Sequence, residues 1–263
     1  MAACRILQIT DLHVFAEPQT RLKGIPTRES LERVVEHIVR NESNYDHVVV
    51  TGDHTHDELP ESYKAVRSIL DQLDAPVWQV PGNHDDRRVM RQVFADRIPG
   101  ADDEPIRFQF LCGEWECLGL DSHLPGEVSG RFDETEAVWL RSHLQASDAR
   151  RIALFLHHPP IDVDSEWMDV IGLQQRELLQ QIVADDDRIR LICCGHVHHE
   201  FVSSLHQATV CTSPSTGIQF DPDGSVPNFS DEPPGYRIIE FDGDSYQTQV
   251  VRLPATGWKP TTE

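Results

Sequence analysis

Basic side chains are scarce in this sequence of 263 residues: 23 Lys and Arg stand against 44 Asp and Glu, and the formal net charge is −21. A surface of this charge repels polyanions, so neither long nucleic acids nor anionic membranes are expected partners. No apolar run approaches the roughly 18 residues of a transmembrane helix. The first residues, MAACRILQIT, lack the basic and apolar regions of a secretory signal, which predicts a cytoplasmic protein.

The cysteines also lack a metal-binding pattern. The six of them form no CxxC pair and no zinc-finger spacing. Cys4, Cys193, Cys194 and Cys211 lie in or at the ends of apolar, strand-like runs, where we expect reduced thiols packed as small hydrophobic groups. Because side chains alternate along a strand, Cys193 and Cys194 should face opposite sides and belong to the core rather than to a thiolate site.

Short apolar runs alternate with amphipathic segments over the first two thirds of the chain. The runs predict buried strands at Arg5–Thr10, His47–Thr51, Val77–Val80, Ile152–His157 and Ile189–Cys194. Helices are expected after a Thr27 cap, after Pro60, from an Asp133–Glu136 capping box through Leu144, and over Leu173–Val183. This succession predicts parallel strand pairs joined by crossover helices, and therefore an α/β protein.

Strands and turns replace this alternation from Phe201 onward. The segments FVSSL, ATVCTS, GYRIIEFD and YQTQVVRL predict antiparallel hairpins in a second sheet or at a sheet edge, with a loop rich in Pro, Gly and Asp over residues 214–235. We expect a single domain over residues 1–253 and a loose C-terminal tail over residues 254–263.

Polar side chains follow each of the five expected strands in the first part of the chain. They are Asp11 and His13; Asp53, His54 and His56; Asn83, His84 and Asp85; His157 and His158; and His196 and His198. Ligands of open α/β sheets bind beyond the carboxyl ends of the strands, so these groups are predicted to converge on one site.

The residue types of this predicted site favour metal ions. Imidazole, carboxylate and amide ligands without thiolate suit manganese, iron, zinc or cobalt. They outnumber the needs of one ion, so two divalent ions about 3.5–4 Å apart and bridged by a carboxylate fit better. Two such ions, two carboxylates and a bridging hydroxide leave a charge of about +1, which can attract one phosphodiester despite the acidic surface.

The chain resembles the calcineurin-like metallophosphoesterases in an ordered set of motifs: Asp11-x-His13, Gly52-Asp53, Gly82-Asn83-His84-Asp85, His157 and Gly195-His196-x-His198. The segments LQITDLHVF, WQVPGNHDD, LFLHHPP, CCGHVHHE, SPSTGIQF and PPGYRIIE further resemble the branch of class III 3′,5′-cyclic AMP phosphodiesterases. The resemblance implies a four-layer α-β-β-α sandwich, in which two mixed sheets lie face to face between helices.

The resemblance also implies a role for each matching residue. Asp11, His13 and His198 would hold one metal, Asn83, His157 and His196 the other, and Asp53 would bridge them. The two divalent ions would be iron, manganese or both, with zinc or cobalt as alternatives. We assign His84, Asp53 and Asn83 to catalysis, and Asn83, His84, His198 and His13 to substrate binding. In an extended Gly195–His198 segment the two imidazoles would point the same way, so that each could reach a different ion.

These roles predict hydrolysis of 3′,5′-cyclic AMP, with other cyclic nucleotides as further substrates, to the 5′-monophosphate. A hydroxide bridging the metals would attack phosphorus in line, and His84 would stabilise the phosphorane oxygens or protonate the departing 3′-oxygen. One alternative keeps the centre but changes the substrate to a glycerophosphodiester, a 2′,3′-cyclic nucleotide or a phosphomonoester. A non-catalytic scaffold of the same fold is another. We expect a small cyclic nucleotide as the binding partner. We expect the protein itself to be a monomer or a homodimer.

Some positions stay open at the level of sequence. His158 competes with His157 as the ligand after its strand, although the strand end and the motif spacing favour His157. His54 and His56 are interpreted as solvated or capping side chains, with support of the metal ligands as the alternative. Phe220 and Ser215–Gly217 either flank a base or anchor a loop, and the Ser213–Gly235 loop shapes either the pocket or an interface. Trp167 is a candidate for a pocket wall.

Overall fold

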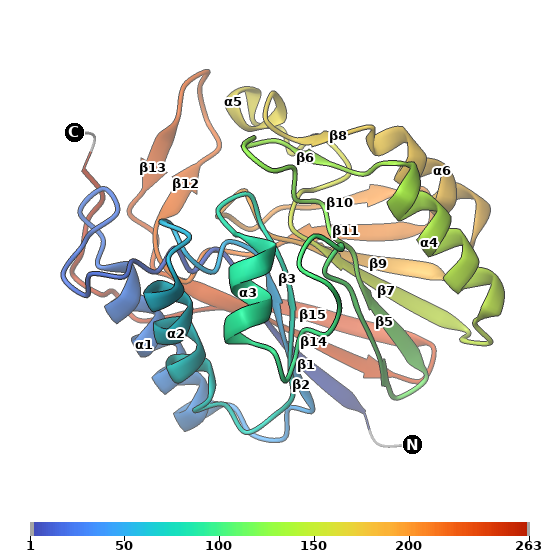
Figure 1. The fold of residues 1–263 in the computed structure, drawn as a ribbon, viewed down its shortest axis with the longest axis horizontal. Helices are drawn as coiled ribbons and strands as arrows, with labels where there is room; N and C mark the ends of the chain where they lie inside the picture. The colour runs from blue at the N-terminus through green and yellow to red at the C-terminus, as the bar shows by residue number, and fades with distance from the viewer. Residues whose placement is uncertain (1–2, 262–263) are drawn as a thin grey trace.

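Two mixed β-sheets packed face to face form the centre of the structure, a computed structural model that describes residues 3–261 (Figure 1). The first sheet contains, in spatial order, β15 (Ser245–Arg252), β14 (Gly235–Asp242), β1 (Cys4–Ile9), β2 (His47–Thr51) and β3 (Val77–Val80). The second contains β10 (Val202–Leu205), β11 (Ala208–Thr212), β9 (Ile189–Cys194), β7 (Arg151–Leu156), β5 (Trp115–Gly119) and β4 (Phe108–Cys112).

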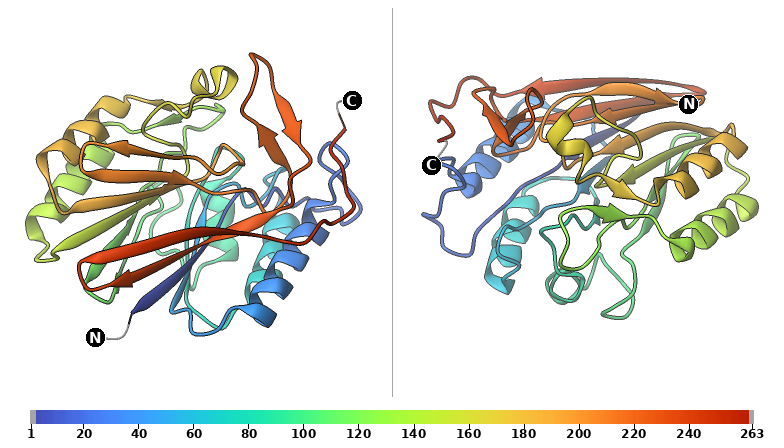
Figure 2. Two further views of the ribbon diagram at one scale, coloured as in Figure 1. Left: turned by 180° about the vertical axis from the view of Figure 1, so that it is seen from behind. Right: turned by 90° about the horizontal axis from the view of Figure 1, so that it is seen from above.

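Helices cover the outer face of each sheet. α1 (Thr27–Asn41) and α2 (Pro60–Leu70) pack on the first sheet, and α4 (Glu134–Ala146) and α6 (Arg176–Asp185) pack on the second (Figures 1 and 2). The parallel pairs β1–β2, β2–β3, β5–β7 and β7–β9 each have one of these helices between their strands in the chain. The α/β class and the four-layer arrangement are therefore confirmed.

Side-chain alternation along the strands separates the hydrophobic cluster between the sheets from the clusters under the helices. In β1, Ile6 faces the second sheet whereas Leu7 and Ile9 face α1 and α2. In β9, Cys193 lies between the sheets and Cys194 lies under the helices, as predicted. Residues that are buried on both faces in this way explain why the strands appear as continuous apolar runs in the sequence.

The antiparallel strands at the end of the chain divide between the two sheets. β10 and β11 form a hairpin at one edge of the second sheet, and β14 and β15 form another at the edge of the first. The segment before β14 also contains a short separate hairpin, β12 (Gln219–Asp221) and β13 (Asn228–Ser230). Sequence reasoning missed this hairpin and the β4–β5 hairpin.

Three smaller elements complete the fold. α3 (Arg87–Val93) follows β3, α5 (Glu166–Asp169) lies beyond β7, and β6 (Gly130–Arg131) pairs with β8 (Leu173–Gln174). The helix expected over Leu173–Val183 therefore begins later, because its first residues pair as β8 and Gln175 adopts a left-handed backbone.

The two predicted helix caps have different outcomes. The Asp133 carboxylate accepts hydrogen bonds from the backbone N–H groups of Thr135 and Glu136, as the capping motif indicated. Thr27 is not a cap: it is the first residue of α1, and its hydroxyl donates to the backbone oxygen of His13 at 2.7 Å. The Thr27 hydroxyl is therefore used to hold a loop that contains a predicted metal ligand.

A disulfide joins the two sheets. Cys4 in β1 is bonded to Cys112 in β4, so the expectation of a reduced Cys4 is wrong. Periodicity places each residue on a strand face but does not tell which strands of different sheets lie opposite one another. Cys117, Cys193, Cys194 and Cys211 are free and buried.

The last described residues of the chain contact its N-terminal part. Within residues 254–261, the Trp258 ring lies 4.2 Å from the Arg33 guanidinium of α1, and Thr261 donates its N–H to the Lys23 oxygen at 2.9 Å. The division into a domain and a tail at residue 254 stays a prediction. Between residues 3 and 261, no helix has both the length and the apolar composition of a membrane span.

Replacing both Cys4 and Cys112 with Ser should lower the free energy of unfolding by about 2–4 kcal/mol, because the bond constrains a long loop of the unfolded chain. The two residues are 108 positions apart in the sequence. Urea denaturation of the variant, and of the unchanged chain with and without a thiol reductant, measures the effect. The reduced chain and the variant should unfold at similar urea concentrations; a variant as stable as the oxidised chain would contradict the prediction.

Candidate metal centre

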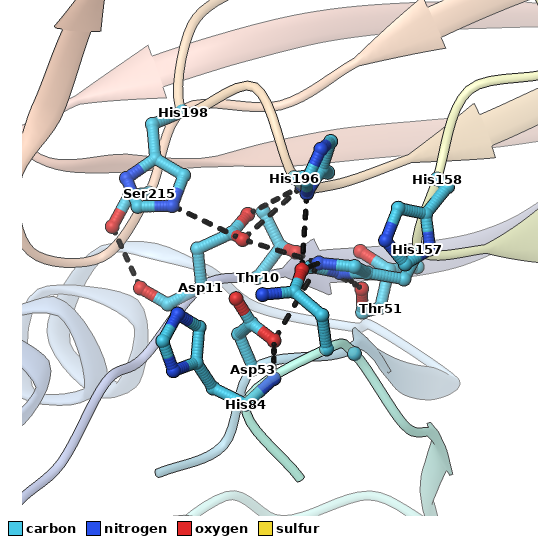
Figure 3. A network of polar contacts seen from close by, with 12 residues as sticks. Thr10, Asp11, Thr51, Asp53, His84, His157, His158, His196, His198 and Ser215 are labelled. Carbon is cyan, nitrogen blue, oxygen red and sulfur yellow. Dashed lines mark hydrogen bonds and ion pairs between the residues drawn. The ribbon is translucent and has the colours of Figure 1, made fainter. Parts of the chain in front are cut away.

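The carboxyl ends of strands from both sheets meet at one edge of the sandwich. In the first sheet, the loops after β1 and β2 are joined by a hydrogen bond from the backbone N–H of Leu12 to the backbone oxygen of Asp53, at 2.8 Å. The N–H of His196, after β9, donates to both carboxylate oxygens of Asp11 at 3.1 Å and so connects the second sheet to the first. The convergence that the sequence predicted is thereby confirmed (Figure 3).

The backbone at this edge is unusual. Five of the predicted ligand residues have a positive φ without being glycine: Asp11 (54°), His13 (45°), Asp53 (53°), His196 (73°) and His198 (52°). Such conformations cost free energy and concentrate at functional sites. They also correct the expectation of an extended Gly195–His198 segment, because left-handed turns direct its two imidazoles.

Two glycines allow the strand ends to approach this closely. Gly52 has φ of 101°, and a Cβ at this position would lie 2.5 Å from the Nδ1 atom of His157. A Cβ on Gly82 would lie 2.2 Å from a carboxylate oxygen of Asp53. Any side chain at either position would therefore displace groups of the centre.

One group of ligand atoms gathers around Asp11. Ligand atoms of Asp11, His13, Asp53 and His198 all lie within 4.8 Å of one another. The Nε2 atom of His198 is 3.2 Å from Asp11 Oδ1 and 3.1 Å from the Nε2 atom of His13. All four residues are buried.

A second group gathers around Asn83. Its Oδ1 atom lies 3.2 Å from the Nε2 atom of His157 and 3.1 Å from the Nδ1 atom of His196. Asp53 lies between the two groups: its Oδ2 atom is 3.4 Å from His13 Nε2, and its Oδ1 atom is 3.5 Å from His157 Nε2. One carboxylate thus presents an oxygen to each group, as a bridging ligand must.

Hydrogen bonds fix which nitrogen of each imidazole faces inward. Nδ1 of His157 donates to the Thr51 oxygen at 2.7 Å, Nδ1 of His198 to the Ile218 oxygen at 2.9 Å, and Nε2 of His196 to the Ile171 oxygen at 3.2 Å. The opposite nitrogen of each ring then faces the centre, which is the usual arrangement of a metal-binding histidine. Sequence reasoning could not find these oxygens, because every residue has one.

His158 also has a ring nitrogen within 4.8 Å of ligand atoms of His157 and His196, but its contacts differ from those of His157. Its Nδ1 atom is 2.9 Å from the Ser122 hydroxyl, and its Nε2 atom donates to the Val128 oxygen at 3.1 Å. Both nitrogens are therefore occupied, whereas Nε2 of the neighbouring His157 points toward Asp53 and Asn83.

Burial and neighbouring charges shift the protonation of the centre. Burial and the adjacent His198 hold the pKa of His13 well below its usual value, and burial with His157 lowers the pKa of His196 to about 3. Burial lowers the pKa of His157 too, but the carboxylates of Asp53 and Asp11 outweigh it and raise this pKa. Mostly neutral imidazoles beside two carboxylates fit divalent cations, which need unprotonated ligands.

His84 lies beside both groups without joining either. Its backbone N–H donates to Asp53 Oδ1 at 2.8 Å, and its ring centroid is 5.0 Å from that of His13. Within residues 3–261, no hydrogen-bond partner is found for its ring nitrogens. The imidazole lines the adjoining pocket and is available to a bound substrate.

The two histidines after Asp53 differ in burial, and both contact other side chains of the site. His54 is completely buried, and its Nδ1 atom is 3.0 Å from the Asp85 carboxylate, which also accepts from the Tyr63 hydroxyl. His56 is half-buried, with its Nδ1 atom 3.2 Å from Nδ1 of His13. The expected solvated role is therefore wrong for His54, whereas His56 is partly exposed and also contacts a predicted ligand.

A pocket of about 260 Å³ opens directly onto the centre. His13, Asp53, Asn83, His84, His196 and His198 form one side of it. The rest of its lining is largely apolar and includes Trp167, Met168, Ile171, Ile218, Phe220 and Phe229. Figure 1 shows α5 and the β12–β13 hairpin, which carry several of these residues, at the same end of the molecule. Trp167 is thus a pocket wall as predicted, and the Ser213–Gly235 loop shapes the pocket.

The family model of the calcineurin-like phosphoesterases matches residues 4–200. The chain is 33% identical to a 3′,5′-cyclic adenosine monophosphate phosphodiesterase of Pseudomonas aeruginosa, over 96% of this chain and 91% of that protein. It is 32% identical to a 3′,5′-cyclic-nucleotide phosphodiesterase of Nostoc sp., over 95% and 92%. Its fold is similar to that of a dimetal phosphatase from Danio rerio, with a TM-score of 0.67, 14% identity, and coverage of 95% of this chain and 98% of that one.

Asp53→Asn should reduce the bound metal from two ions to at most one per chain, because a neutral amide cannot bridge two cations as a carboxylate does. The hydrogen bond from the His84 N–H to Oδ1 can be kept by the Asn oxygen, so the fold should persist. Elemental analysis after metal loading, with a thermal melt, measures both. Asp187→Asn, at an exposed position, is the matched control; two ions retained in Asp53→Asn would contradict the bridging position.

Proposed function

Because the chain belongs to the calcineurin-like phosphoesterase family, we propose that it is a metal-dependent phosphodiesterase that hydrolyses 3′,5′-cyclic AMP to the 5′-monophosphate. The observation that carries this proposal is the position of Asp53, with one oxygen toward each of two ligand groups at the floor of a pocket. Near-full-length similarity to two cyclic-nucleotide phosphodiesterases supports the substrate class.

We assign Asp11, His13 and His198 to one metal and Asn83, His157 and His196 to the other, with Asp53 shared. Two divalent ions bound here supply a water nucleophile at neutral pH and offset the charge of the phosphodiester. The mixture of imidazole nitrogens with carboxylate and amide oxygens favours iron or manganese, with zinc or cobalt as alternatives.

The residues around the two groups complete the reaction. The Asn83 amide is neutral and so provides a ligand oxygen without cancelling positive charge. The imidazoles of His13 and His198 line the pocket, so the bound substrate would lie against the edges of their rings. His84, whose ring nitrogens face no protein partner within residues 3–261, donates a proton to the departing 3′-oxygen or a hydrogen bond to the phosphoryl oxygens.

The apolar wall of the pocket suits a nucleobase. The Phe220 ring lies 3.9 Å from the His198 ring and parallel to it, and the Trp167 and Phe229 rings are 5.1 Å and 5.9 Å from Phe220. Aromatic faces stack on bases of any sequence, so they bind the nucleoside part while the centre binds phosphate. A phosphate ion without a nucleoside would make no contact with this aromatic surface.

The remaining expectations stay predictions. We propose a small cyclic nucleotide as the partner, and a monomer or homodimer as the assembly. We propose a cytoplasmic location, whereas the Cys4–Cys112 disulfide is more typical of oxidising compartments. Fractionation of the cells that produce the protein, with thiol labelling of Cys4 and Cys112, would decide the location.

A substrate panel on the metal-loaded protein tests the proposed function. It compares 3′,5′-cyclic AMP, 3′,5′-cyclic GMP, 2′,3′-cyclic AMP, a glycerophosphodiester, bis-p-nitrophenyl phosphate and p-nitrophenyl phosphate. We expect the highest kcat/KM for a 3′,5′-cyclic nucleotide, with the 5′-monophosphate as product. A monoester preferred by more than about tenfold would refute a phosphodiesterase, and no turnover by a chain that binds two ions would identify a scaffold.

His84→Ala should lower kcat by about 10²–10⁴-fold, the usual contribution of a positioned acid, and leave the metal content nearly unchanged. The expectation follows from a ring that lines the pocket and is not part of the Asp11–His13–Asp53–His198 group, although one of its nitrogens lies within 4.8 Å of ligand atoms of His13 and His56. Steady-state kinetics and elemental analysis on one preparation measure both effects. His206→Ala, in an exposed turn, is the control; loss of both ions in His84→Ala would show that His84 is a ligand.

A further inference from the structure

His13 differs from the other three imidazoles of the centre in what holds it. His157, His196 and His198 each donate one ring N–H to a backbone oxygen. The Nδ1 atom of His13 instead lies 3.2 Å from the Nδ1 atom of His56, a side chain that is neither a proposed ligand nor part of a repeated motif. The hydrogen-bond partner of His13 is therefore an imidazole side chain, whereas the other three histidines bond to backbone oxygens.

The same ring of His56 also contacts His84. The two imidazoles are stacked, with centroids 4.6 Å apart and an interplanar angle of 20°. Phe15 lies on the ring of His56 at 4.9 Å, and the backbone N–H of His56 donates to the Val14 oxygen at 3.1 Å. The His56 ring is thus fixed by its own neighbours and can in turn orient two others.

We propose that His56 is a positioning residue that acts on both halves of the centre, an inference that rests on the proposed function. Its Nδ1 atom accepts the N–H of His13, which leaves Nε2 of His13 unprotonated and directed toward Asp11, Asp53 and His198. Its ring face holds His84 in the orientation that reaches the phosphoryl group. Hydrogen bonds to ligating imidazoles change metal affinity by about 10- to 100-fold.

Two substitutions separate the two contacts. His56→Asn places an amide oxygen near the position of Nδ1, and so keeps an acceptor for His13 but removes the ring stacked on His84. His56→Phe keeps a ring for His84 but removes the acceptor. His206→Asn and His206→Phe, at the exposed turn between β10 and β11, are matched controls that contact no part of the centre.

The first measurement is a titration of the metal-free protein with Mn²⁺, followed by calorimetry. We expect His56→Phe to bind the ion about 10- to 100-fold more weakly than the unchanged chain, and His56→Asn to stay within about threefold of it. Equal affinities in all three proteins, or equal losses in both variants, would overturn the action on His13. Thermal melts of both variants and controls separate these results from a loss of folding.

The second measurement is kcat for bis-p-nitrophenyl phosphate at saturating Mn²⁺. His56→Asn should lower kcat by about 3- to 10-fold, the value of a lost ring contact, while His56→Phe should restore it to within about twofold. A lower kcat in His56→Phe than in His56→Asn would overturn the action on His84. The Mn²⁺ titration needs no substrate, and this diester is not a cyclic nucleotide, so both results are distinguishable from a failure of the proposed function.

Discussion

The shared position of Asp53 imposes an electrostatic constraint on the rest of the structure. Asp11 and Asp53 are buried next to each other, and within residues 3–261 their ion-pair partners are histidines only. Burial of a carboxylate without a compensating cation costs several kcal/mol. The raised pKa of His157 reflects this demand for positive charge, which divalent ions satisfy far better than a proton on one imidazole.

The packing of the two sheets brings the proposed ligands together from distant parts of the chain. Asp11, Asp53 and Asn83 follow strands of the first sheet, whereas His157, His196 and His198 follow strands of the second. The left-handed backbones of five of them store strain that the packed sheets and the hydrogen bonds of the loops must offset. Two hydroxyl groups provide such support. The Ser215 hydroxyl donates to the backbone oxygen of Asp11 at 2.6 Å, and the Thr27 hydroxyl donates to the backbone oxygen of His13.

An acidic protein that acts on an anion must confine its attraction to a small volume. The formal net charge of −21 repels phosphate at a distance, while the two ions proposed at the centre would attract it over a few ångströms. The apolar part of the pocket lining reduces the water around the centre and so strengthens that local attraction. The long β12–β13 segment is therefore part of the site, although its composition alone is that of a surface loop.

The sequence by itself determined the strands β1, β2, β3, β7 and β9 and the polar residues at their ends, because buried strands and their terminal turns are encoded locally. The tertiary structure alone decided which ring nitrogens point inward, why His157 rather than His158 faces the centre, and that His56 supports His13. It also decided the Cys4–Cys112 bond across the sheets. Each of these depends on a backbone oxygen or side chain brought close from a distant part of the chain, and periodicity carries no information about such neighbours.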